Sequence, residues 1–334
     1  MLATAAPNPW TVELIVVDGR TDGGGRRALS RDVVRGLLLR LRRGVYVERV
    51  SFEGMTPEQQ HVVRMRALAA VSNRPVVFSH FSAAVVHRVP VLWTRLGRLH
   101  TTIAAPREGG QEAVVGHLLP LHAGEVMQVG SLLVTAPART VIDVAAGAPF
   151  DEGVMATDAA LRRGMDRSVL EQAIDAAGPR RAGKRMREAV AFGHPGGESA
   201  AESRTRTTLL RLGFAPPELQ HRLVLHDGTE VFLDLLFPEF RVGGEIDGAK
   251  KLLDPAIARD ARLALVAEKR REDAIRLQLA GLARWGWVES GSPERLAAIL
   301  GRVGVEPATP RAVLSDYVEV ARTATPRVQP VARR

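Results

Sequence analysis

Short apolar runs separated by turn-forming residues characterise the last third of the chain. Two runs, Val231–Phe237 and Arg241–Asp247, flank Pro238-Glu239 and predict a β-hairpin. A third run at 219–225 is joined to the first by an Asp-Gly pair, a strong signal for a tight turn. We therefore expect the three runs to form a β-meander.

Helical patterns flank this meander on both sides. Residues 198–212 carry leucines on one side, Gly213 fits the position after a helix, and Pro216-Pro217 excludes its continuation. Residues 260–279 predict a long charged helix, and 284–288 a final strand. This order is typical of an α/β (α+β) domain with a mixed sheet flanked by helices.

Shorter elements are expected in the first 200 residues. Apolar runs punctuated by Pro and Gly predict strands at 76–78, 99–104, 114–120, 126–129 and 132–134. Periodic patterns predict helices at 56–71, 137–145, 150–162, 168–177 and 185–192. Together they indicate a small α/β region.

A basic segment near the N-terminus is a candidate nucleic-acid surface. Ser30 is placed to cap a helix over 31–41 with an apolar stripe, and a short strand is expected at 44–47. A basic helix followed by a strand is typical of the end of a winged helix-turn-helix, although two clear helices before Ser30 are missing. A small amphipathic surface helix fits the pattern equally well. In the first interpretation the nucleic-acid contacts are Arg31, Arg35, Arg42 and Arg43.

Two stretches rich in Gly and Pro, 178–185 and 194–197, indicate the main domain boundary. The expected organisation has five parts. They are a winged-helix-like segment at 1–52, an α/β region at 53–177, a linker at 178–197, a second domain at 198–306 and a tail at 307–334.

Composition excludes several classes of protein. The chain has 334 residues, 46% of them hydrophobic and 25% charged, as in globular proteins with more than one domain. It lacks cysteine, which excludes disulfides and thiolate zinc sites. No apolar run approaches the ~20 residues of a membrane span, and no secretory signal is evident at the N-terminus. We therefore expect a soluble cytoplasmic protein.

The formal net charge of +9 favours a polyanionic partner such as nucleic acid, since each neutralised phosphate releases a counterion. Most of the positive charge comes from arginine. A GC-rich genome explains the preference for arginine over lysine, but it does not explain the excess of basic over acidic residues.

Three carboxylates are expected at one end of the predicted hairpin. If the strands pair symmetrically, Asp234 and Glu245 lie opposite one another, and Asp247 shares a face with Glu245 because side chains alternate along a strand. Like charges at close range are costly unless a cation or a proton offsets them. A divalent-metal site is the resulting hypothesis.

Residues 198–300 resemble the Vsr-like (very-short-patch-repair-endonuclease-like) domain of many actinobacterial proteins, which belongs to the PD-(D/E)XK nuclease superfamily. The matching features run in order over about a third of the chain. They are Glu202-Ser203, Leu212-Gly213-Phe214, Pro217-Glu218-Leu219-Gln220, Leu233-Asp234-Leu235, Gly244-Glu245-Ile246-Asp247-Gly248 with Lys250, Glu268-Lys269-Arg270-Arg271-Glu272-Asp273, and the strand around Trp285.

The resemblance implies a restriction-endonuclease-like fold and a metal-dependent DNA endonuclease. In it, Asp234 and Glu245 would hold Mg²⁺, for which Mn²⁺ substitutes, with the Ile246 carbonyl as a third ligand and Glu202 as an outer carboxylate. The superfamily usually has Lys two residues after the Glu, where this chain has Asp247. Family members tend to share this Asp, and Lys250 is the nearest replacement for the missing charge.

The charged run at 268–273 has two interpretations. In one, Lys269 and Arg270 contact phosphates. In the other, the run is an exposed helix face stabilised by pairs of opposite charges one turn apart.

Residues 56–165 resemble the middle of AbiEi-type antitoxins, in which a winged-helix segment often comes first. The matching stretches are Phe78-Ser79-His80-Phe81-Ser82-Ala83-Ala84 and Val134-Thr135-Ala136-Pro137-Ala138-Arg139-Thr140-Val141-Ile142-Asp143. The resemblance implies a non-catalytic type IV toxin-antitoxin regulator that binds DNA and a cognate toxin protein. A protein-interaction module with an eroded nuclease site is a third interpretation.

Overall fold

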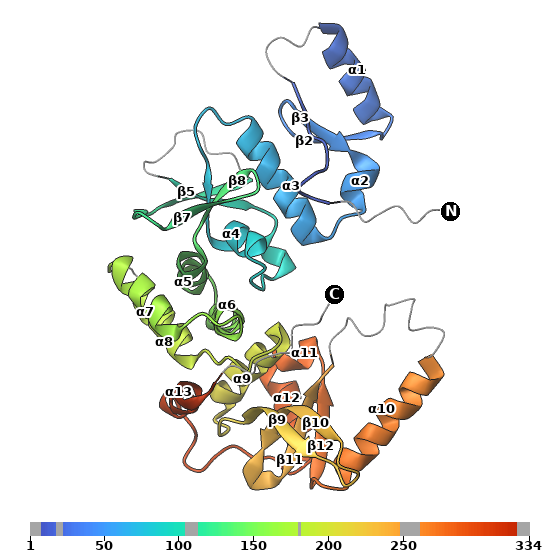
Figure 1. Cartoon of the computed structure of the whole chain (residues 1–334), viewed down its shortest axis with the longest axis vertical. Helices are drawn as coiled ribbons and strands as arrows, with labels where there is room; N and C mark the ends of the chain where they lie inside the picture. Colours follow the sequence, from blue (N-terminus) through green and yellow to red (C-terminus); the bar gives the residue numbers. More distant parts are fainter. Residues whose placement is uncertain (1–7, 18–22, 104–112, 180–181, 248–260, 326–334) are drawn as a thin grey trace. The chain divides into compact units, whose positions relative to one another are not determined.

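The computed structural model describes residues 8–17, 23–103, 113–179, 182–247 and 261–325, without the side chains of 23 and 261–268. The chain divides into two compact units: Met1–Ala148 with Val169–Gly183, and Pro149–Ser168 with Lys184–Arg334. We call them unit 1 and unit 2. Both combine helices with strands, so the α+β class expected from the sequence is confirmed (Figure 1).

Unit 1 begins with a small antiparallel sheet. Strands β1 (Ile15–Val16), β2 (Leu38–Arg42) and β3 (Val45–Glu48) have the order β1-β3-β2. Helices α1 (Gly23–Val34), α2 (Arg49–Glu53) and α3 (Pro57–Ala70) accompany it. Apolar residues of β3, α2 and α3 form the core of this part: Val47, Phe52, Met55 and Val63.

The helix expected over 31–41 is wrong. Helix α1 ends at Val34, and Gly36, with a φ of 76°, turns the chain into β2. Ser30 lies inside the helix, where its hydroxyl donates to the Arg26 carbonyl and caps nothing. The apolar alternation of Leu39 and Leu41 serves a strand, because both side chains pack against the core around Val47.

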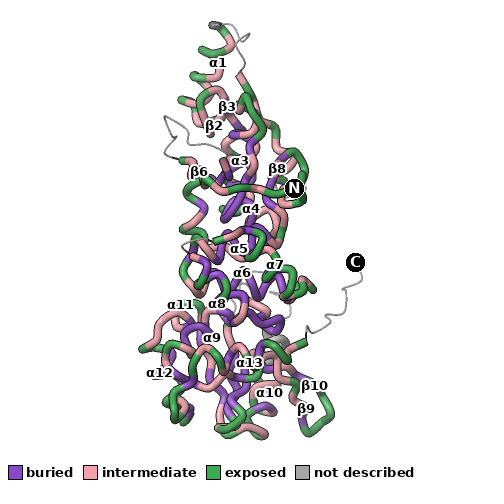
Figure 2. The backbone as a smooth tube through the Cα atoms, turned by 90° about the vertical axis from the view of Figure 1, so that its left-hand side faces the viewer, coloured by how far each residue is buried: buried purple, intermediate pink, exposed green. Residues whose placement is uncertain are grey.

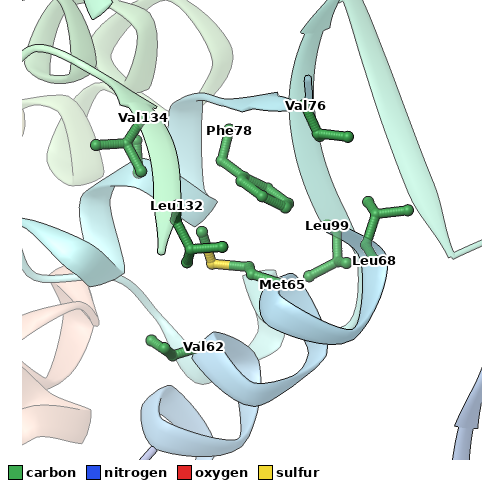
Figure 3. Close-up of a cluster of buried hydrophobic side chains, with 9 residues drawn as sticks. Val62, Met65, Leu68, Val76, Phe78, Leu99, Leu132 and Val134 are labelled. Atoms are coloured by element: carbon green, nitrogen blue, oxygen red, sulfur yellow. The ribbon is translucent and has the colours of Figure 1, made fainter. Parts of the chain in front are cut away.

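A second, mixed sheet forms most of unit 1. Its strands are β4 (Val77–Phe78), β5 (Leu99–Ile103), β6 (Val114–Leu118), β7 (Val126–Val129) and β8 (Leu132–Thr135), in the order β6-β5-β4-β8-β7. Helix α3 packs on it through Met65, which meets Phe78 and Leu132 in the core cluster (Figure 3). The short helix Trp93–Arg95, α4 (His80–Val86) and α5 (Pro137–Gly147) complete this part.

Unit 2 contains the predicted meander. Strands β9 (Glu218–Val224), β10 (Glu230–Phe237) and β11 (Val242–Ile246) are antiparallel neighbours, and a short helix at Pro238–Phe240 makes the second turn. Strand β12 (Gly281–Trp285) pairs in parallel with β11, which gives a mixed sheet of order β12-β11-β10-β9. Strand β12 starts three residues before the position expected for the final strand.

Helices flank the sheet of unit 2, as expected. They are α9 (Ala200–Leu212), α10 (Ala261–Arg276), α11 (Trp287–Ser290) and α12 (Pro293–Arg302). Helix α10 packs on the sheet through Ile275, which joins Leu233 and Leu282 in the core. Helix α9 ends at Gly213 in the left-handed conformation, as the sequence predicts.

Two glycines allow β11 to pass close to the side chains of neighbouring elements. A Cβ on Gly243 would lie 2.9 Å from side-chain atoms of Leu279 and Leu282, and one on Gly244 would lie 2.6 Å from the Trp285 ring. The indole N–H of Trp285 donates to Thr205 of α9 at 3.0 Å, which fixes the ring against the strand. Close packing is therefore the reason for the Gly-Gly pair.

The expected linker at 178–197 is structured. It contains α8 (Gly183–Phe192), and residues 192–197 are buried (Figure 2). Helix α6 (Phe150–Arg162) belongs to unit 2, because buried Asp158 accepts hydrogen bonds from Ser203 and Arg206 of α9 at 2.7 and 2.8 Å. Helix α7 (Arg167–Ala176) lies where the chain passes between the units.

The expected tail also holds a helix, α13 (Leu314–Thr323). Its Tyr317 donates to the Phe214 carbonyl at 3.0 Å and stacks on Phe192. None of the described helices is long and apolar enough to cross a lipid bilayer.

We predict that Gly244→Ala destabilises unit 2 by about 1–3 kcal/mol, the usual cost of overpacking a core. The added methyl must displace the Trp285 ring, which is held by Thr205. Urea unfolding followed by tryptophan fluorescence measures the effect. Gly301→Ala is the control: a Cβ there meets nothing within 4 Å, and Ala favours the helix, so the midpoint should not fall. Equal midpoints for Gly244→Ala and wild type would contradict the packing argument.

Candidate functional site

Glu202 in the first turn of α9 is the first residue of the candidate site. Ser199 caps the helix by accepting a hydrogen bond from the Glu202 backbone N–H at 3.1 Å. The Glu202 carboxylate accepts from the Glu198 N–H at 3.0 Å and from the Gln220 side chain of β9 at 3.2 Å. Glu202 is only 4% exposed, so this is no solvated helix start.

Asp234 and Glu245 lie next to the last residue pair of the β10–β11 hairpin. The register pairs Phe237 with Val242, Leu236 with Gly243 and Leu235 with Gly244, and Asp234 and Glu245 are the next residue on each strand away from the turn. One carboxylate oxygen of Asp234 also accepts the Ile246 N–H at 2.7 Å. The hairpin thus places two acids and the Ile246 backbone at the same end of the sheet.

Arginines from two other elements hold Glu245. Arg284 is its register partner on β12, and Arg284 Nε and Nη2 lie 3.0 and 2.5 Å from Glu245 Oε2. Arg271 of α10 places Nη2 3.0 Å from Glu245 Oε1 and donates to the Phe232 carbonyl. Although Arg271 is close, Oε1 accepts no hydrogen bond from the described residues. The Arg271–Glu245 contact is therefore an ion pair without hydrogen-bond geometry.

Glu272 completes the network on α10. Its carboxylate lies 3.4 Å from Arg284 Nη1 and is held from the next turn by Arg276 at 2.8 Å. Two acids and three arginines thus alternate along β11, β12 and α10.

Burial and a neighbouring charge make Glu202 a proton-binding group. Burial, followed by the negative charge of Asp234, raises the pKa of Glu202 to about 7. The hydrogen bonds from Ser199, Glu198 and Gln220 oppose this rise without cancelling it. The effect of Asp234 shows that the two carboxylates sense one another, which joins α9 to the hairpin site.

The remaining predicted residues lie elsewhere. Asp247 is exposed, and its backbone N–H donates to the Trp285 carbonyl. Lys269 and Arg270 are exposed on α10, and Lys250 lies outside the described residues. Within the described part of the chain no three His, Asp or Glu side chains are arranged to hold a metal ion as they stand.

The predicted arginines of unit 1 lie on two elements. Arg31 is in the last turn of α1 and Arg35 follows it, whereas Arg42 ends β2 and Arg43 lies in the turn before β3. No residue of α1 whose side chain is described is buried (Figure 2). The sequence reasoning missed Arg26 and Arg27, which are exposed on the same helix.

Four further site residues were missed in unit 2: Gln220, Arg271, Glu272 and Arg284. The pairing of β12 with β11 joins segments about 40 residues apart, and no local pattern announces it. The only available signal was the dense charge at 268–273, which also fits an exposed helix face.

Unit 1 holds a second polar cluster, around His61. Its ring nitrogens lie 2.8 Å from the Ser82 hydroxyl and 3.1 Å from the Leu96 carbonyl. The Leu96 carbonyl can only accept, so Nδ1 carries the proton of the neutral ring and Nε2 accepts a hydrogen bond from the Ser82 hydroxyl. This resembles an activated serine, but both residues are 0% exposed, and burial lowers the pKa of His61 to about 4. Without access for a substrate, the pair is structural.

We predict that Glu202→Gln stabilises the protein more at pH 8 than at pH 5. The folded pKa of Glu202 lies above its ordinary value of 4.5. Its stabilising contribution is therefore fully present below pH 4.5 and is lost as the pH rises through about 7. Gln keeps the acceptor oxygen without the charge, so the difference should approach, at most, about 3 kcal/mol. Urea unfolding at the two pH values measures it.

Asp234→Asn tests the cause of this shift. Removing the negative charge of Asp234 should lower the pKa of Glu202. In the Asp234→Asn background, the stabilisation by Glu202→Gln should then differ less between pH 5 and pH 8. A Glu202→Gln effect that is the same at both pH values would contradict the burial of this carboxyl.

No family model matches the chain. No solved structure matches it either. The chain is 32% identical over 144 residues to uncharacterized protein MT2308 of Mycobacterium tuberculosis strain CDC 1551 / Oshkosh. It is equally similar to uncharacterized protein Rv2248 of strain ATCC 25618 / H37Rv. The match covers 42% of this chain and 53% of each relative, so the chain spans about half the length of the curated relatives it matches. Neither name states an activity, and function must be argued from the residues of the site.

Proposed function

We propose that the protein binds nucleic acid and that unit 2 is a DNA endonuclease supported by a divalent cation. The single observation that carries the proposal is the approach of Asp234 to the Ile246 backbone beside Glu245, where β10 pairs with β11, with Glu202 close enough to be affected by the Asp234 charge. The order of these residues along the chain also resembles that of the Vsr-like nucleases.

The donor atoms suit magnesium. Asp234 and Glu245 provide carboxylate oxygens, Ile246 a carbonyl and Glu202 an outer carboxylate, and Mg²⁺ or Mn²⁺ prefers such all-oxygen surroundings. The Glu245 Oε1 atom accepts no hydrogen bond from the described residues, but Arg271 Nη2 lies 3.0 Å from it, so a cation could use this oxygen only where Arg271 moves away. When bound, the cation would lower the pKa of a water and offset charge on the phosphate.

The chain's own groups supply the rest of the chemistry. In hydrolysis, a water oxygen bonds to phosphorus, the bond to the leaving sugar oxygen breaks, and a proton reaches that oxygen. Glu202, with a pKa near 7, can hold or release a proton at neutral pH. Arg284 and Arg271 supply the positive charge that the superfamily usually obtains from the Lys replaced here by Asp247.

We predict that Mg²⁺ or Mn²⁺ supports nicking of plasmid DNA by the full chain. Asp234→Asn and Glu245→Gln should each reduce nicking by about 100-fold or more, the usual cost of removing a group that stabilises charge in the transition state. Gel analysis of supercoiled DNA measures the rate, and fluorescence anisotropy checks that DNA binding survives.

The matched control is Asp227→Asn at the opposite end of the same meander. Asp227 is exposed and caps a turn by accepting the Thr229 N–H at 2.9 Å, which Asn can also do. Its nicking rate should equal that of wild type. Nicking that persists in Asp234→Asn and Glu245→Gln would reject the site.

A DNA-binding regulator of the antitoxin kind is the second candidate, and α1 with the β2–β3 hairpin favours it. Residues 23–43 contain one acid, Asp32, and seven arginines: Arg26, Arg27, Arg31, Arg35, Arg40, Arg42 and Arg43. A pocket of about 570 Å³ on α1 is lined, among the described residues, by Gly24, Arg26, Arg27, Ser30 and Arg31. Such a basic surface suits a nucleic-acid backbone. If unit 2 does not cleave DNA, the protein would act as a DNA-binding repressor.

We predict that Arg26→Gln with Arg27→Gln weakens duplex binding and lowers the slope of log affinity against log salt by about 2, close to one for each lost phosphate contact. Arg42→Gln with Arg43→Gln should do the same. Fluorescence anisotropy from low to moderate salt measures both. The control pair Arg74→Gln with Arg98→Gln removes two exposed charges of unit 1 outside this surface and should keep the wild-type slope. An unchanged slope in both test pairs would exclude this surface.

A further inference from the structure

We propose that Arg271 and Arg284 hold Glu245 in the free protein, and that a phosphodiester group takes over these arginines and thereby releases Glu245 for a divalent cation. Nucleic acid would then open the cation site. The inference rests on the proposed function and concerns the regulation of the same site.

Burial separates the carboxylate from the groups that hold it. Glu245 is 7% exposed, whereas the side chains of Arg271 and Arg284 retain 32% and 30% of their accessible surface. A ligand arriving from solvent can therefore reach the guanidinium groups more easily than the carboxylate. The arrangement presents positive charge outward and keeps the negative charge behind it.

The arginines and a cation would compete for the same oxygens. Arg284 occupies Glu245 Oε2 with two nitrogens, and Arg271 lies against Oε1. A metal ion needs lone pairs of these atoms, so at least one arginine must withdraw.

Neighbouring positive charge opposes a cation that arrives alone. Among the described residues, Arg271 and Arg284 lie against Glu245, and Arg276 and Arg284 lie against Glu272. A divalent cation at Glu245 would lie beside these guanidinium groups in a partly buried place, where screening by water is weak. A phosphodiester brings compensating negative charge with it.

A phosphate is a suitable replacement partner for the arginines. The planar guanidinium group binds phosphate and carboxylate oxygens with the same two-pronged geometry, so the exchange costs Arg284 no hydrogen bonds. Glu272, fixed by Arg276, remains beside Arg284 Nη1 and keeps the side chain oriented. Glu245 in turn exchanges two arginines for a cation and is never left as an unpaired buried charge.

The exchange couples the two ligands. If DNA raises the affinity for the cation by some factor, the cation must raise the affinity for DNA by the same factor. A site regulated in this way binds the cation more weakly until nucleic acid is bound.

Mn²⁺ binding to the full chain, measured by electron paramagnetic resonance, tests the proposal. The probe is a 12-base-pair duplex with phosphorothioate linkages that resist cleavage. For wild type, we expect saturating duplex to tighten Mn²⁺ binding about tenfold, within the usual range of coupling between sites. Without duplex, Arg284→Gln should bind Mn²⁺ about tenfold more tightly than wild type. Adding duplex should then tighten its Mn²⁺ binding less than it does for wild type.

Two further variants protect the test against misfolding. Arg271→Gln leaves the two-pronged Arg284 contact intact and should show a smaller change in the same direction. Arg222→Gln removes another arginine–glutamate pair of the same sheet, with exposed Glu230, and should leave Mn²⁺ affinity and its duplex dependence at wild-type values. Thermal unfolding confirms that each variant is folded.

The outcomes separate this inference from the proposed function. If Mn²⁺ binding survives in Asp234→Asn and Glu245→Gln, the cation site itself is wrong. If both variants lose Mn²⁺ but wild type binds it equally with and without duplex, the site stands and the exchange is rejected. The exchange is also rejected if neither Arg271→Gln nor Arg284→Gln binds Mn²⁺ more tightly than wild type.

Discussion

The passage of β11 through the middle of unit 2 is the constraint on which the candidate site depends. Gly243 and Gly244 leave room on the two faces of the sheet for Leu279 and Leu282 and for the Trp285 ring. The strand can therefore continue through the core to Glu245, which is the register partner of Arg284 on β12. The position of Glu245 thus depends on the two residues before it, which have no side chains.

A buried ion pair organises the other side of unit 2. Asp158 of α6 accepts hydrogen bonds from Arg206, Ser203 and the His194 N–H, all within 2.8 Å. Arg206 also donates to the Phe192 carbonyl. A carboxylate without access to water requires such partners, so α6 and the segment before α9 cannot belong to a separate linker. This contact positions α9 and therefore also Glu202, which lies in the first turn of that helix.

Local patterns in the sequence predicted most of the elements. The meander, the end of α9 at Gly213 and helix α6 were predicted within a few residues, because turns, caps and periodicity are written in neighbouring positions. The helix expected at 31–41 failed because one apolar pattern can serve a helix or a strand, and Gly36 decided between them. The helix predicted at 185–192 is observed as α8, but the burial of residues 192–197 was not predicted, because glycine and proline signal a break equally well in a buried turn.

The candidate site shows the same division between what neighbouring residues predict and what only the whole fold determines. The register of β10 with β11 was predicted from hairpin symmetry, which involves only adjacent strands, and it brings Asp234 to the Ile246 backbone beside Glu245. The arginines that hold Glu245 come from α10 and β12, so their contacts depend on a parallel pairing and on helix packing. Long-range pairing of this kind follows from the whole fold and has no local signature.

This difference changes how Asp247 should be interpreted. From the sequence, Asp247 adds a third acid to the hairpin and takes the position of an expected lysine. In the structure it is exposed, and positive charge enters the site from Arg271 and Arg284. Arg271 and Arg284 already supply positive charge at Glu245, and Arg276 and Arg284 supply it at Glu272. Acid at that position is therefore compatible with a phosphate-binding site whose cations are supplied by neighbouring elements.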